Sequence, residues 1–125
     1  MGLLADVKSL MTGVSNVYLG SMPNSPDIAV ALYATGGYPR DLSGTMVEEP
    51  TFQVKVRHAT YSTGETLCNT IKDLLHGQNN KTIGSGVTAR KILLIAQEGD
   101  VLNLGRDENN RQMWSMNFRA YYRRP

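Results

Sequence analysis

The stretch Thr51-Phe52-Gln53-Val54-Lys55-Val56-Arg57-His58 alternates apolar and polar side chains more cleanly than the rest of the chain. One face would carry Phe52, Val54, Val56 and His58, and the other would carry Thr51, Gln53, Lys55 and Arg57. Strict alternation is typical of a strand that is buried on one face only. The stretch therefore predicts a half-buried strand whose apolar face must be covered by another layer.

A helix is predicted directly after this strand. Ser62-Thr63-Gly64-Glu65 has the pattern of a capping box, in which a hydroxyl and a later carboxylate satisfy the first free amides of a helix. Apolar residues then follow at helical spacing, namely Leu67, Cys68, Ile71, Leu74 and Leu75, and Gly77 marks the end. This pattern predicts a helix over residues 63–76. A similar stripe predicts another helix over residues 2–14.

The other apolar stretches predict strands over residues 17–20, 28–33, 90–97 and 113–122. The simplest arrangement is an α+β fold, a mostly antiparallel sheet of about 4–5 strands with two helices packed on one face. We expect a single domain, residues 1–125, with long loops at residues 34–50, 77–87 and 98–112, where Gly, Pro and polar residues gather. The polar faces of strands 51–58 and 113–122 are suited to contact a partner.

Composition excludes several classes of protein. With 125 residues, 41% of them hydrophobic, and a formal net charge of +2, the chain is neither disordered nor a polybasic phosphate binder. The single Cys68 excludes an intramolecular disulfide and a four-thiolate zinc site. The longest apolar run, residues 92–96, is far shorter than the roughly 20 residues that cross a bilayer, and the N-terminus lacks the basic flank of a signal peptide. We therefore expect no membrane partner.

The residues that usually carry catalysis are few. His58 ends the apolar face of a strand, His76 lies at a predicted helix C-terminus, and Cys68 lies on an apolar helical stripe, so structural roles are favoured for all of them. The acidic residues Glu98, Asp100, Asp107 and Glu108 are interspersed with arginines, which indicates a solvated loop rather than a metal site. We expect no catalytic residue, no cofactor and no metal, and hence no enzyme.

Tyr and Arg are enriched in protein interfaces, so the exposed ones are candidates for contacts with a partner or another subunit. The candidates are Tyr38, Arg40 and Asp41 in the first predicted loop, and Arg57, Arg106, Arg119 and Tyr121 on predicted exposed faces or turns. Two alternatives stay open. Arg57 and Arg119 could pair with acidic side chains within the chain. The interleaved basic and aromatic residues 119–124 could bind nucleic acid by phosphate contact and stacking.

Several stretches, in this order, carry a resemblance to a known family. They are residues 28–39 (IAVALYATGGYP), residues 50–57 (PTFQVKVR), residues 74–77 (LLHG), residues 105–108 (GRDE) and residues 118–122 (FRAYY). Together they resemble the minor capsid or tail terminator proteins, also called tail completion proteins, of long-tailed bacteriophages. The resemblance covers residues 3–124.

This resemblance implies a structural virion protein with an α+β sheet and helices on one side. Such proteins form a ring, expected to be a hexamer of this chain, that caps the head-proximal end of the tail tube and stops its polymerisation. The implied partners are the major tail tube protein and the head connector or stopper protein, with DNA only passing through the lumen. Assembly would take place in the bacterial host cytoplasm, and the mature protein would reside in the virion at the head–tail junction.

Two other functions stay open at this point. One is a head-completion or stopper protein of the connector, which is a small protein from the same set of head–tail joining components. The other is a small nucleic-acid-binding module, which the interleaved Arg and Tyr residues of the C-terminus suggest.

Overall fold

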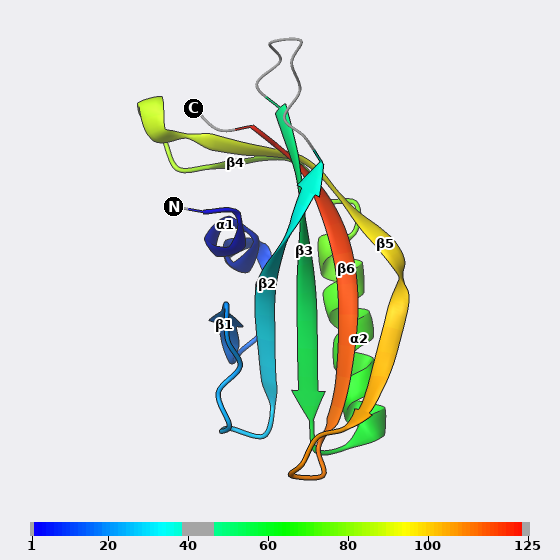
Figure 1. The fold of residues 1–125 in the computed structure, drawn as a ribbon. Coiled ribbons are helices and arrows are strands. Elements are labelled where there is room, and N and C mark those ends of the chain that lie inside the picture. Colours follow the sequence, from blue (N-terminus) through cyan, green and yellow to red (C-terminus); the bar gives the residue numbers. More distant parts are fainter. Residues whose placement is uncertain (1, 39–46, 124–125) are drawn as a thin grey trace.

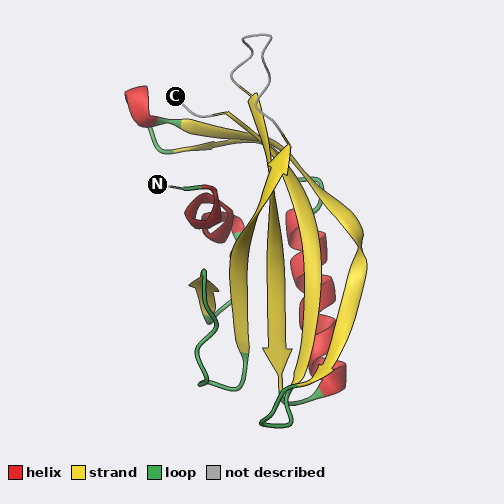
Figure 2. Cartoon of the chain, in the orientation of Figure 1, coloured by secondary structure: helices red, strands yellow, loops and turns green. Residues whose placement is uncertain are grey.

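The computed structural model describes residues 2–38 and 47–123 and shows one curled sheet with helices on its inner side (Figure 1; Figure 2). In chain order the elements are α1 (Leu3–Leu10), β1 (Val17–Leu19), β2 (Ala29–Tyr38), β3 (Val47–His58), α2 (Tyr61–Leu75), β4 (Asn79–Ile83), the short 3₁₀ helix η1 (Gly86–Thr88), β5 (Arg90–Arg106) and β6 (Gln112–Arg123). The α+β class is thus confirmed.

The sheet has more strands than expected and is mixed. Its six strands lie in the order β1-β2-β3-β6-β5-β4, in place of the four to five mostly antiparallel strands that the sequence predicted. Neighbours are antiparallel except β1 and β2, which run parallel because residues 20–28 carry the chain back along the sheet before β2 begins. The additional edge strand, β4, lies inside a predicted loop.

The central strands β3 and β6 supply much of the core. Their inner faces meet in the directly opposed pairs Phe52–Phe118, Val54–Met116 and Val56–Trp114, and all of these side chains are buried. The rings of Phe52 and Phe118 stack with their centroids 5.4 Å apart, an arrangement that adds to the energy of burial. The alternating pattern of residues 51–58 and 113–122 is therefore confirmed.

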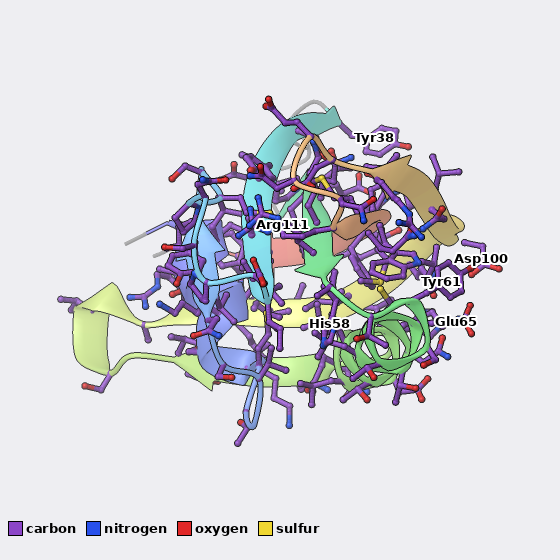
Figure 3. All side chains as sticks on the ribbon, turned by 90° about the horizontal axis from the view of Figure 1, so that it is seen from below. Tyr38, His58, Tyr61, Glu65, Asp100 and Arg111 are labelled. Atoms are coloured by element: carbon purple, nitrogen blue, oxygen red, sulfur yellow. The ribbon has the colours of Figure 1, made fainter. Side chains whose placement is uncertain are left out.

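Both helices lie on the inner side of the curled sheet, as Figure 3 shows from below. α1 buries Val7 in the core and Met11, directly after the helix, is buried there as well, while α2 buries Ile71 and Leu75. α1 ends at Leu10, earlier than the expected helix over 2–14, because the chain turns at Gly13, which has a positive φ of 86°. The expectation of two helices on one face is confirmed.

The start of α2 differs from the predicted capping box. The helix begins at Tyr61, so Ser62 lies in its first turn, and the N-cap residue Thr60 makes no side-chain capping bond. His58 Nδ1 instead accepts a hydrogen bond from the Thr60 backbone N–H at 3.0 Å. The structural role expected for His58 is thereby found: it ends β3 and fixes the turn into α2.

Most of the predicted long loops are strand. Residues 34–38 continue β2 and residues 47–50 begin β3; residues 39–46, including the candidates Arg40 and Asp41, lie outside the described part. Residues 79–83 form β4, and β5 extends to Arg106, so only residues 107–111 remain as a turn within 98–112. Glycines that look like loop markers lie beside irregularities in the strand register, for example Gly37, at a φ of 134°. A Cβ there would meet Glu49 O at 2.5 Å.

One buried polar cluster joins the two ends of the chain. Asp6 of α1 accepts hydrogen bonds from Arg90 Nε at 2.9 Å, Arg90 Nη2 at 2.8 Å and Tyr122 Oη at 2.5 Å. Asp6 is 1% exposed and Tyr122 is 3% exposed. Burial alone would raise the pKa of Asp6, but the hydrogen bonds from Arg90 and Tyr122 outweigh burial, so the pKa is lowered. We refer to these residues as the Asp6 cluster.

Replacing Asp6 is expected to destabilise the protein more than replacing its neighbours. Asp6→Asn leaves Arg90 facing a neutral partner, and loss of one member of a buried ion pair costs on the order of 3 kcal/mol. Tyr122→Phe removes one hydrogen bond and should cost about 1 kcal/mol. Urea unfolding followed by circular dichroism measures both. Equal losses in the two variants would contradict the central place given to the carboxylate.

The same cluster predicts a pH dependence. Because the pKa of Asp6 is lowered in the folded state, its contribution is fully present above the unfolded value of about 3.9 and is lost as the pH falls through the folded pKa. The difference in unfolding free energy between the wild-type protein and Asp6→Asn should therefore shrink below about pH 4. A difference that stays constant down to pH 2 would contradict this linkage.

Gly64 should tolerate no side chain, although it lies in a helix. A Cβ at Gly64 would lie 2.9 Å from His58 Cβ and closer still to the ring of Trp114. Gly→Ala in a helix ordinarily stabilises by about 1 kcal/mol. Here the close approach should reverse the sign, with a net loss of about 1–3 kcal/mol. Thermal unfolding of Gly64→Ala, with exposed Asn69→Ala in the same helix as the control, tests this sign.

Candidate interaction surfaces

Polar side chains of four strands, β2, β3, β5 and β6, surround Arg119 on the outer face of the sheet. These strands lie side by side in Figure 1. Arg119 Nη2 donates to Glu98 Oε2 of β5 at 2.9 Å and to Tyr38 Oη of β2 at 2.6 Å, and its Nη1 donates to Tyr121 Oη at 3.3 Å. Glu49 of β3 lies 3.8 Å away, and the guanidinium carbon lies 4.1 Å from the centre of the Tyr38 ring. We call this group the Arg119 cluster.

The Arg119 cluster brings together three of the residues predicted from sequence, Tyr38, Arg119 and Tyr121. The hydrogen bond from Arg119 to Glu98 is the largest cause of the raised pKa of Arg119. The alternative in which Arg119 pairs with an acidic side chain of its own chain is therefore the arrangement found. Tyr38, 49% exposed, is the member that presents most surface to a partner.

Arg57 is not exposed, contrary to the sequence-based expectation. Its side chain lies under the segment between β1 and β2 and is 4% exposed. Arg57 Nε donates to Asp27 O at 3.1 Å, and Nη2 donates to Pro26 O at 2.5 Å. Burial and the nearby Arg111 lower the pKa of Arg57. Its role in the structure is to hold this segment against the sheet, and alternation alone could not reveal the cover.

Arg106 lies at the end of β5, beside the turn 107–111, which is stabilised by hydrogen bonds between its own residues. Arg106 is exposed, and its Nη1 donates to Asn110 Oδ1 at 2.7 Å. Asp107 accepts hydrogen bonds from the backbone N–H groups of Asn109, at 3.0 Å, and Arg111, at 2.8 Å. The buried Arg111 also donates to Asn24 O, which joins this turn to the segment between β1 and β2 (Figure 3). The sequence did not predict this contact between the two segments, because Asn24 and Arg111 are far apart in the chain.

The residues considered for catalysis have structural surroundings. His76 Nδ1 accepts a hydrogen bond from Gln97 N at 3.0 Å, which ties the end of α2 to β5. Cys68 is fully buried, and burial raises the pKa of its thiol to about 12. Within residues 2–38 and 47–123, no group of three or more His, Cys, Asp or Glu side chains is placed to hold a metal ion. In that same range, no helix is long and apolar enough to span a membrane.

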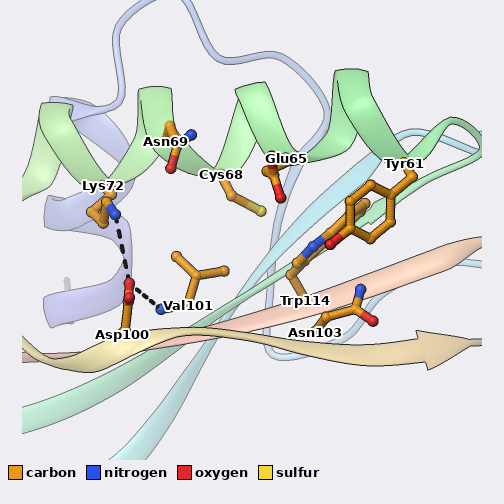
Figure 4. A pocket seen from close by; sticks show the side chains of 9 residues that line it. All are labelled: Tyr61, Glu65, Cys68, Asn69, Lys72, Asp100, Val101, Asn103 and Trp114. Atoms are coloured by element: carbon orange, nitrogen blue, oxygen red, sulfur yellow. Dashed lines mark hydrogen bonds and ion pairs between the residues drawn. The ribbon is translucent and has the colours of Figure 1, made fainter.

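A shallow pocket of about 230 Å³ lies between α2 and the irregular part of β5 (Figure 4). Lys72 Nζ lies 3.6 Å from Asp100 Oδ1 at one end, and the ring of Tyr61 lies 5.5 Å from that of Trp114 at the other. Asp100 Oδ1 also accepts a hydrogen bond from Val101 N at 2.7 Å, which shapes the strand where its register shifts. These contacts link helix and sheet and bring no nucleophile and base together.

Two further surfaces lie outside the Arg119 cluster. The first overlaps the loop 77–87 predicted from sequence, which was a candidate for a subunit contact, and the structure shows it as an arm, residues 79–89. The arm is made of β4, η1 and the turns around them, and it projects from the body beside the N-terminus (Figure 1). Its tip carries Val87, which is 91% exposed. The sequence signal for this surface is Val87, a single apolar residue between Gly84-Ser85-Gly86 and Thr88. An exposed apolar residue in a glycine-rich turn indicates a contact outside the turn.

The second surface is an apolar groove of about 510 Å³ between α1 and the upper part of β2, which we call the α1–β2 groove. Its lining includes Leu3, Leu4, Leu19, Ala34, Gly36 and Pro50. β1 pairs only with Val30–Leu32 and ends at Leu19. In the described part of the chain, β2 therefore has no strand beside it on this edge beyond that point.

Comparison with known proteins identifies the family of this chain. A family model described as bacteriophage tail terminator protein matches residues 2–124. The chain belongs to the bacteriophage tail terminator family. The terminator chain is also similar in fold to a chain of the virion of a native gene transfer agent particle, with a TM-score of 0.56 and 16% identity over 98% of this chain and 85% of that one. No curated protein matches it.

Membership of this family makes the terminator a structural phage protein with a role in completing the tail, as the resemblance implied. The family is one of structural phage proteins and is not known as an enzyme family. Likeness to the gene transfer agent chain, at 16% identity, supports the fold alone. The site residues themselves stay predictions, since family membership assigns none of them.

The Arg119 cluster predicts a measurable coupling. Arg119→Gln, Glu98→Gln and the double variant form a thermodynamic cycle in urea unfolding. The double variant of the terminator should lose less stability than the sum of the single ones, because the two side chains bond directly. This coupling should weaken in 1 M salt, since both side chains are partly exposed. Arg106→Gln, whose partner is neutral, is the matched control and should show no coupling to Glu98.

Proposed function

We propose that this terminator forms a hexameric ring on the head-proximal end of the tail tube, stops tube polymerisation there, and docks the tail to the head connector, with DNA passing through the lumen. The observation that carries the proposal is the match of the tail terminator family over residues 2–124. The major tail tube protein, the connector or stopper protein and further copies of the chain are its partners. Assembly takes place in the host cytoplasm, and the ring stays at the head–tail junction of the virion.

Surface composition supports a ring. A closed ring is built from heterologous contacts, in which each subunit offers two different patches. The protein has exposed apolar side chains in separate places, including Val87 on the arm, Leu19 beside the α1–β2 groove and Leu102 on β5. An apolar side chain that is exposed in one copy gains energy when a neighbour buries it.

Three arginines with partners in their own chain are suited to a channel that DNA crosses without being held. Arg57 and Arg111 bind backbone carbonyls, and Arg119 binds Glu98. Guanidinium groups with partners in their own chain attract phosphate less than free ones do, and the formal net charge is only +2. This arrangement favours transit of DNA over a nucleic-acid-binding module.

Tyr38, Arg40, Asp41, Arg106, Arg119 and Tyr121 remain the candidate contacts with another subunit or a partner. In the structure Tyr38 and Tyr121 lie in the Arg119 cluster, and Arg106 lies beside the turn 107–111. Arg40 and Asp41 fall outside the described residues. Arg57 is withdrawn from this set because it is buried.

A phage that lacks this gene product tests the function. Without a terminator, tubes should exceed their normal length and should not join heads, and electron micrographs measure both. Supplying the wild-type protein in trans should restore tails of normal length. Tails of normal length in its absence would contradict the proposal. Tails of normal length beside heads that have lost DNA would instead identify a head-completion or stopper protein.

A further inference from the structure

We propose that the arm, residues 79–89, of one terminator copy docks in the α1–β2 groove of a second copy, with Val87 as the side chain that enters the groove. This inference rests on the proposed ring and names its subunit contact. It starts from two surfaces of the same chain that are each incomplete, an exposed apolar tip and an apolar groove.

The arm has the features of an element that reaches a neighbour. It extends beyond the body of the protein (Figure 1). Val87, in the short helix η1 of the arm, is 91% exposed. The base of the arm is fixed, because Ile83 packs against the core and Arg90 donates to Asp6. A fixed base lowers the entropy that is lost when the tip binds. The tip is therefore preorganised for a contact outside its own subunit.

The groove can accept such a tip by side-chain and main-chain contacts. Leu3, Leu4 and Leu19 provide an apolar lining, and about 510 Å³ is open there. Beside it lies the edge of β2, past the point where β1 stops pairing. Open strand edges bind extended segments through backbone hydrogen bonds, while neighbouring pockets accept side chains.

Charge favours a second copy as the occupant. The arm and the strand after it, residues 77–97, contain no acidic residue; Arg90 is buried against Asp6, which leaves Lys81 and Lys91 as the positive charges. The chain that leads into the groove at Pro50 is acidic, with Glu48-Glu49. Opposite signs on the two patches orient their encounter. Two different patches on one chain also give the heterologous contact that a ring requires.

Disulfide cross-linking between two single-cysteine variants tests the contact. Val87→Cys protein is mixed with Leu19→Cys protein under mild oxidation, so that a mixed dimer reports a bond between different copies. The native Cys68 is fully buried and does not compete. The matched control is Leu102→Cys, whose side chain is more exposed than Leu19, at 59% against 41%, and lies outside the groove. Mixed dimer should form at least tenfold more with Leu19→Cys than with Leu102→Cys.

Equal cross-linking to both partners, or none to Leu19→Cys, would overturn the docking. A chain that carries both cysteines should give a ladder of covalent oligomers that stops at the copy number of the ring. The exposed substitution Val87→Asp should fold as the wild-type protein does and fail to restore tails in trans. If Val87→Asp restores tails of normal length, the arm contact is wrong while the terminator function stands. If tails of normal length form in the absence of the protein, the proposed function itself is wrong.

Discussion

The fold depends on one buried carboxylate. Asp6 holds Arg90 and Tyr122, which places the first helix, the start of β5 and the end of β6 around a single charge. A buried charge of this kind is tolerated only when its hydrogen bonds are complete. The charge of Asp6 is therefore compensated only when α1, β5 and β6 are all in place. The same contact sets the base of the arm, because Arg90 is the first residue of β5. Stability and the geometry of a proposed subunit contact are thereby linked.

The long periodic elements were predictable from sequence. Phe52, Val54 and Val56 alternate and are buried as expected, and the stripe through Ile71 and Leu75 does form α2. What failed was the interpretation of glycine. At Gly37 the backbone has a positive φ inside a strand, beside a shift of register, so the residue marks an irregular strand rather than a loop. Strand edges such as β4 also escape local patterns, because their pairing depends on β5.

The surfaces were predictable only in part, for a different reason. Tyr38, Arg119 and Tyr121 were singled out by type, and the register of the strands brings them together. Arg57 was misplaced, since alternation says which face a residue occupies and not whether a segment covers that face. The covering segment, which includes Asp27, comes just before β2 and lies 30 residues before Arg57 in the sequence. Long-range contacts of this kind are set by tertiary packing, which no local pattern encodes.

The strand order has a consequence for how the protein is made. β6 comes after the other five strands in the chain, yet it lies between β3 and β5 in the middle of the sheet. Until it leaves the ribosome, β3 and β5 each lack a central neighbour, and the inner faces they share cannot close. The sheet can therefore close only when β6 is present, and contacts distant in sequence dominate its formation, which slows folding. Chains that lack β6 hold no complete sheet, so they cannot present surfaces that depend on the register of β3, β6 and β5.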